Sequence, residues 1–160
     1  VWTFFMGGAQ VASRSLVGNA NLVTKVSFPR AIVPLAAITG NAFTAAAMLA
    51  VALPLCLVLT ADSLLPLVVL PGLILLLAAL TVGFGLLVAA LNVYFRDVEH
   101  ILAAISLPWI FLTPIFYSFD VVAGLQDGGR DWVRYLLHYG NPVSPIVIAI
   151  QDVLFWGRWP

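Results

Sequence analysis

Two long stretches without a charged side chain constrain this chain more than any other feature. Residues 31–61 and residues 64–95 contain no Asp, Glu, Lys or Arg, and only Asp62 and Ser63 separate them. As a helix, the first stretch would be about 46 Å long, which exceeds the ~30 Å hydrocarbon core of a bilayer. We therefore predict two membrane-spanning helices joined by a short turn, the first of them tilted or projecting from the membrane at its Pro34 end.

The composition favours a membrane environment for the whole chain. Of 160 residues, 62% are hydrophobic and 9% are charged, whereas a soluble domain averages ~25% charged residues. So few charges cannot cover a globule with polar surface. The zero formal net charge argues against a nucleic acid partner, and the single cysteine, Cys56, excludes a disulfide framework or a Cys-rich metal site. Because Val1 is not an initiator Met and no closing segment precedes Pro160, we expect a fragment of a longer protein.

The region before the first charge-free run contains two further elements. Residues 1–18 are moderately apolar, and we expect either the end of a membrane helix with Arg14 at the aqueous interface or an amphipathic surface helix. In the polar stretch that follows, Asn21 can cap a helix and Pro29 disfavours helical backbone just before it, which predicts a short amphipathic helix over residues 21–28. Such a helix suits docking into a groove on a soluble partner, with the lipid surface as the alternative. The residues assigned to this contact are Leu22, Val23, Lys25, Val26, Phe28, Pro29 and Arg30.

A charged turn separates the second charge-free run from a third apolar segment, residues 101–118. Its charged residues are Arg96, Asp97 and Glu99. We predict an interfacial turn in which Arg96 and Asp97 pair locally or contact a partner. The alternative is a catalytic or metal-binding cluster of Asp97, Glu99 and His100, which would need partners elsewhere. The other histidine, His138, is expected on the opposite side of the membrane.

The segment 101–118 is just long enough to span a bilayer, but Pro108 and Pro114 interrupt it and aromatic side chains are dense within it. These features favour a helix that lines a pathway, and packing against lipid or neighbouring helices is the alternative for each aromatic residue. The candidate pathway residues are Trp109, Phe111, Thr113, Phe116 and Tyr117. Residues 119–160 are predicted to form a hydrophilic loop followed by re-entrant or interfacial helices, because their apolar run is too short to span.

The distribution of basic residues sets the expected orientation. One side holds Arg14, Lys25, Arg30 and Arg96 in short loops, and the other holds Arg130, Arg134 and Arg158 among several aspartates. The excess of positive charge places residues 19–30 and 96–100 in the cytoplasm and residues 119–160 outside.

Three phrases of the sequence together resemble the permease subunit of type-2 ABC exporters. They are NANLVTKVSFPRAIVP at 19–34, LNVYFRDVEH at 91–100 with PWIFLTPIFY at 108–117, and Asn141-Pro142 followed by Ile146. The chain is most similar to permeases that export O-antigen, capsular polysaccharide or teichoic acid across the bacterial inner membrane.

The resemblance implies a multi-pass permease of six membrane helices that works as a homodimer with two separate ABC ATPase subunits and a lipid-linked glycan substrate. It implies that residues 21–28 are the cytoplasmic coupling helix, that residues 132–156 are small gate helices, and that Asn141 and Pro142 belong to an outer gate. No phosphate-binding loop, nucleophile elbow or zinc-helix motif occurs, so the chain is expected to be neither an enzyme nor a holder of a metal or cofactor.

The predicted fold is therefore an all-α integral membrane domain over residues 1–160. It would be a helical bundle with roughly three complete spanning helices, part of another, the coupling helix, and short re-entrant or interfacial helices on the outer side. Two functional alternatives remain at this point: an ABC exporter permease for drugs or lipids, and an integral-membrane transferase that acts on a lipid-linked substrate at the charged turn.

Overall fold

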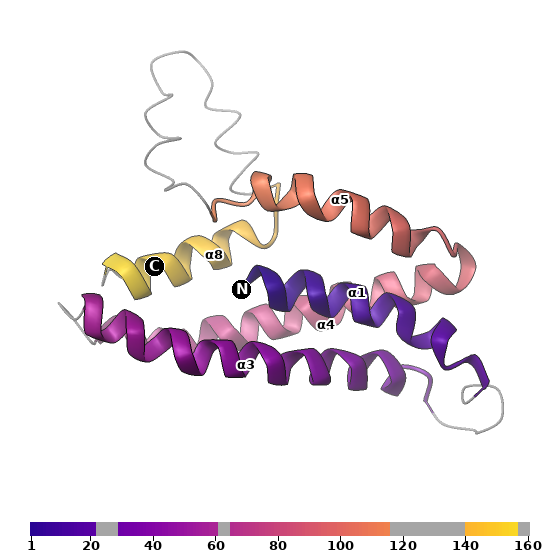
Figure 1. Ribbon diagram of the computed structural model, residues 1–160, viewed down its shortest axis with the longest axis horizontal. Helices are drawn as coiled ribbons and strands as arrows, with labels where there is room; N and C mark the ends of the chain where they lie inside the picture. Colours follow the sequence, from indigo (N-terminus) through magenta and orange to yellow (C-terminus); the bar gives the residue numbers. More distant parts are fainter. Residues whose placement is uncertain (22–28, 61–64, 116–139, 157–160) are drawn as a thin grey trace, which may run out of the picture. The chain divides into compact units, whose positions relative to one another are not determined.

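The computed structural model describes residues 1–21, 29–60, 65–115 and 140–156, and every regular element in these ranges is helical. The helices are α1 (Trp2–Gly18), α3 (Ile32–Thr60), α4 (Leu70–Tyr94), α5 (Val98–Leu112) and α8 (Ser144–Gln151). A short 3₁₀ helix, η1 (Leu65–Val69), precedes α4, and a π-helical turn, η3 (Asp152–Trp156), follows α8 (Figure 1). The expectation of an all-α protein is confirmed for the part of the chain that the structure describes.

Within the described residues, two segments are long and apolar enough to cross a membrane, and both lie in the charge-free runs. They are Ile32–Leu55 with 24 residues and Leu67–Tyr94 with 28 residues. As helices they would measure about 36 Å and 42 Å, more than the ~30 Å hydrocarbon core. The α-helical part of the second run begins only at Leu70, because Pro71 lacks a backbone N–H and fits an α-helix best in its first turn. The sequence reading had treated this run as one helix from residue 64.

The third apolar helix, α5, is shorter than the 101–118 segment predicted from the sequence. It has 15 residues, about 22 Å of helix, and ends at Leu112. The cause is Pro114, which disfavours helical backbone at the preceding residue. Instead, Thr113 N donates to the carbonyls of Trp109 and Ile110 in a tightening last turn. Within the described residues, α5 is therefore too short to span alone.

The chain forms two compact units, one made of Val1–Ala52 with Leu77–Ser106 and the other of Leu53–Leu76 with Leu107–Pro160. In the first unit, α1 packs against α3 and α4 through small residues (Figure 1). A Cβ atom added to Gly8 would lie 2.6 Å from Thr81 Cγ2, and one added to Gly85 would lie 3.2 Å from Ala12 Cβ. Such close approach is the usual basis of helix packing in lipid, where burial of apolar surface contributes little.

The contacts of α1 favour the first of its two predicted placements, a helix within the bundle. One side of α1 is buried, including Phe5, Ala9 and Ala12 at 0% exposure, and Phe5 stacks on Phe84 with ring centroids 5.3 Å apart. Asn41 Nδ2 donates a hydrogen bond to the Phe4 carbonyl at 2.9 Å. Asn41 lies about 14 Å along α3 from Ile32, well inside the span. Asn41 thus forms an interhelical hydrogen bond within the first candidate span.

Candidate functional site

The predicted contact segment joins α3 without a flexible linker. Ile32 N donates to the Pro29 carbonyl at 3.0 Å, and Leu35 N donates to the Ala31 carbonyl at 3.2 Å. Proline also fixes its own φ angle. Pro29 is therefore tied by a backbone hydrogen bond to the first residue of α3. Of the other residues assigned to this contact, Arg30 is exposed, and Leu22, Val23, Lys25, Val26 and Phe28 lie outside the described residues.

Described residues of the two segments predicted to be cytoplasmic lie close together in the first unit. Ala20 and Arg30 from the first, and Arg96 from the second, line a single depression of about 270 Å³. Its remaining walls are Leu16, Val17 and Val93, and we call it the arginine-flanked depression. Because α3 and α4 would each cross the membrane once, the residue before α3 and the residue after α4 must emerge on the same side. The shared depression agrees with that requirement.

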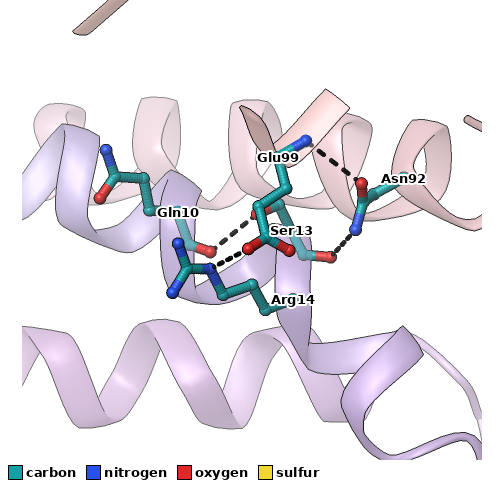
Figure 2. A network of polar contacts seen from close by, with 5 residues as sticks. All are labelled: Gln10, Ser13, Arg14, Asn92 and Glu99. Atoms are coloured by element: carbon teal, nitrogen blue, oxygen red, sulfur yellow. Dashed lines mark hydrogen bonds and ion pairs between the residues drawn. The ribbon is translucent and has the colours of Figure 1, made fainter. Parts of the chain in front are cut away.

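A set of polar side chains, which we call the polar junction, joins α1, α4 and α5 beside this depression. Its members are Ser13, Arg14, Asn92 and Glu99 (Figure 2). Arg14 Nε lies 2.8 Å from Glu99 Oε1, with the two side chains 60% and 29% exposed. An ion pair this accessible contributes about 0–1 kcal/mol, so it orients the helices more than it stabilises them.

Asn92 is the buried centre of the polar junction, with only 2% of its surface exposed. Its Nδ2 donates to the Ser13 carbonyl at 2.9 Å, and its Oδ1 accepts from Glu99 N at 3.2 Å (Figure 2). The first N–H groups of a helix have no partner within that helix. Asn92, which belongs to α4, therefore caps the start of α5 through its Oδ1. The Nδ2 of the same amide group bonds the Ser13 carbonyl in the C-terminal half of α1.

The charged turn differs in one respect from the sequence expectation. Among the described residues, the ion pair at this turn joins Glu99 to Arg14, and no pair forms between Arg96 and Asp97. Arg96 and Asp97 are both exposed, so contact with a partner remains the open half of that prediction. No group of three or more His, Cys, Asp and Glu residues in the described ranges could hold a metal ion.

Sequence reasoning missed Asn92 and Ser13 altogether. A signal for Asn92 was available, because it is an amide at the end of a charge-free run, and a polar group in lipid needs a partner. Nothing in the sequence identified the Ser13 carbonyl as that partner.

A second cluster of polar contacts, in the second unit, joins the end of α5 to α8. Asn141 Nδ2 donates to Thr113 Oγ1 at 2.8 Å, and Asn141 Oδ1 accepts from Val143 N at 3.1 Å, just before α8. At the far end of α8, Gln151 Nε2 donates to the Pro114 carbonyl at 3.0 Å. We call this arrangement the amide clip. The carbonyl of Pro114 is available because α5 has already ended.

The candidate pathway residues have different environments. Phe111 is 65% exposed and Trp109 is half-buried. Thr113 is fully buried, and its hydroxyl donates to the Trp109 carbonyl at 3.0 Å, so it serves the amide clip. Phe116 and Tyr117 lie outside the described residues, as does most of the 119–160 segment.

Comparison with known proteins decides the family. The family model described as "ABC-2 type transporter" matches residues 1–155. This chain belongs to the ABC-2 type transporter family. The resemblance to type-2 ABC permeases is thereby confirmed, and the chain is a transporter component and not an enzyme.

Relatives of this ABC-2 chain carry permease names. It is 28% identical over 163 residues to "O-antigen export system permease protein RfbA" of Myxococcus xanthus, an alignment that covers 99% of this chain and 59% of that protein. It is 22% identical over 162 residues to a protein of the same name from Klebsiella pneumoniae, covering 98% of this chain and 58% of the relative. The ABC-2 chain thus spans less than two thirds of the relatives that it matches.

Proposed function

We propose that this chain is the membrane-spanning part of an ATP-driven exporter that moves a lipid-linked polysaccharide across the bacterial inner membrane. The ABC-2 family match supports a transporter, and the names of the relatives favour an O-antigen-type cargo. ATP would be hydrolysed by a separate ATPase subunit, and a second copy of the permease would complete the pathway.

The observation that carries this proposal is that the described end of the predicted coupling segment and the charged turn line one depression beside the polar junction. Arg30 and Arg96 line one depression, and Arg14 and Glu99 pair beside it. A push on residues 22–30 would reach α3 through the Pro29 turn. It would reach α4 and α5 through Asn92, which holds both of them to α1. One contact could thus move four helices together.

The proposed pathway lies along the aromatic part of α5. Aromatic faces suit the C–H groups of sugars. Because this segment has few charged side chains, it would not bind the passing polymer tightly. Phe111 is exposed, and Trp109, Phe116 and Tyr117 are the other proposed contacts. Asn141, with Pro142 beside it, would anchor the outer gate by holding the start of α8 to the end of α5.

The decisive experiment places a charge in the proposed coupling face of the full-length permease. Phe28→Asp should abolish co-purification of the ATPase subunit and surface display of the polymer, while leaving membrane insertion intact. Phe28→Leu is the matched control, because it keeps an apolar side chain, and it should retain both. Normal co-purification and ATP turnover in Phe28→Asp would refute the coupling role.

A further inference from the structure

The arginine-flanked depression lies beside the start of the first candidate span and the end of the second. Arg30 is two residues before Ile32, where the first candidate span begins, and Arg96 is two residues after Tyr94, where the second ends. Tyr94 is 82% exposed and Phe95 is 66% exposed. Exposed aromatic residues are typical of the boundary between hydrocarbon and headgroups. The depression therefore opens at the membrane surface.

Among the residues that the structure describes, two arginines and no carboxylate line the depression. Arg30 and Arg96 are both exposed, and within the described ranges neither forms an ion pair. Arg14 differs, because Glu99 neutralises it. Asp97 is adjacent in sequence to Arg96 but is not among the lining residues. Two guanidinium groups on one depression, with no carboxylate among its described lining residues, form a site that favours an anion.

The other walls of the depression are apolar, which separates this site from one for a soluble anion. Leu16 and Val17 come from the end of α1, and Val93 comes from the end of α4. Val17 and Val93 are 41% and 53% exposed, so they present apolar surface to solvent or lipid beside the two arginines. The matching ligand carries a phosphate and an apolar chain on the same molecule. A volume of about 270 Å³ is near the lower limit for ligand pockets and suits a headgroup, not a whole lipid.

We propose that this depression binds the phosphate of an anionic membrane phospholipid between Arg30 and Arg96, with the start of an acyl chain against Leu16, Val17 and Val93. Basic pockets between membrane helices on the cytoplasmic side are suited to such headgroups. The proposal requires that the chain lies in a membrane. It does not require that the chain exports a glycan, so the two ideas can fail separately.

The test measures how lipid stabilises the purified full-length permease with its ATPase in detergent. Phosphatidylglycerol, phosphatidylcholine and inorganic phosphate are titrated, and the unfolding midpoint temperature is recorded. Phosphatidylglycerol should raise the midpoint, whereas phosphatidylcholine, which has no net charge, and inorganic phosphate, which has no acyl chain, should have little effect. Arg96→Gln should raise the phosphatidylglycerol concentration for half-maximal effect about fivefold, as loss of one basic contact implies. Arg96→Lys should recover most of that loss.

Arg14→Gln is the matched control, because it removes the same charge nearby but outside the depression. It should leave the half-maximal phosphatidylglycerol concentration unchanged, even if the protein becomes less stable. Equal stabilisation by phosphatidylcholine, an equal response to inorganic phosphate, or an equal loss of affinity in Arg14→Gln would each overturn the proposal. It would also be overturned if Arg96→Gln released the ATPase while its lipid response stayed normal, since the depression would then be a protein-docking surface.

Discussion

The contact between Gly8 and Thr81 allows a quantitative test of how α1 is held in the bundle. A Cβ on residue 8 would lie 2.6 Å from Thr81 Cγ2, about 1 Å closer than carbon atoms pack. Thr81 has little freedom to move away, because it is fully buried and its Oγ1 donates to the Leu77 carbonyl at 2.7 Å. That bond fixes the rotamer of a stiff, β-branched side chain. Gly8→Ala should therefore cost about 1–3 kcal/mol of stability.

The assay is thermal unfolding of the full-length permease in mild detergent, followed by the loss of its monodisperse peak on size exclusion. A loss of 1 kcal/mol lowers the midpoint by about 2–4 °C for a chain of 150–250 residues, so Gly8→Ala should lower it by about 2–12 °C. Gly18→Ala is the control on the same helix, because an added Cβ there meets nothing within 4 Å. Its midpoint should be unchanged or slightly higher, since alanine favours helix.

A second substitution tests whether the clash itself is the cause. Thr81→Ser removes Cγ2 but keeps the hydroxyl that bonds Leu77. Alone it should cost about 1 kcal/mol for one buried methyl group. Because the clash is then gone, the double variant should be about as stable as Thr81→Ser alone, which corresponds to a coupling energy of about 1–3 kcal/mol. The packing argument is wrong if Gly8→Ala is as stable as the wild type, or if the two losses simply add.

Three further predictions use the same thermal assay unless another is named. Asn92→Ala should lower stability by about 1–3 kcal/mol at any salt concentration, since it leaves buried groups unpaired, whereas Arg14→Ala should cost at most ~1 kcal/mol and only at low salt; equal salt dependence would contradict this assignment. Gly85→Ala should be destabilising and Gly83→Ala neutral, because of these two positions only Gly85 has atoms within 4 Å of an added Cβ. A greater loss of stability in Gly83→Ala than in Gly85→Ala would mean that α4 turns a different face to its neighbours. Asn141→Ala should speed limited proteolysis between α5 and α8 without weakening ATPase binding, and an unchanged cleavage rate would show that the amide clip does not hold α8.

The long helices were predictable because lipid imposes a simple rule on sequence. A run without charge that is longer than the bilayer is thick has few alternatives to a spanning helix. This reasoning placed α3 and α4 to within a few residues at most ends. The predicted length of α5 was too great. The apolar run continues to residue 118, but Pro114 restricts the backbone of Thr113 and ends the helix earlier.

The candidate site was less predictable, since its contacts join residues far apart in the chain. The charged turn was expected at the membrane surface, and it lies beside Arg30 as that topology requires. The partner of Glu99 was not foreseen, because Arg14 belongs to a helix whose orientation no sequence period could fix. A polar amide in lipid needs a hydrogen-bond partner, and both Asn41 and Asn92 have one on a neighbouring helix.

The double role of Asn92 limits the ways in which α5 can turn. Its amide group holds a carbonyl of α1 on one side and the N–H of Glu99 on the other. Rotation of α5 about its own axis would carry that N–H out of range and leave the buried Asn92 Oδ1 without its partner. The start of α5 is therefore constrained by its hydrogen bonds to move together with α1 and α4. Only movements that all three helices share leave the hydrogen bonds of Asn92 intact.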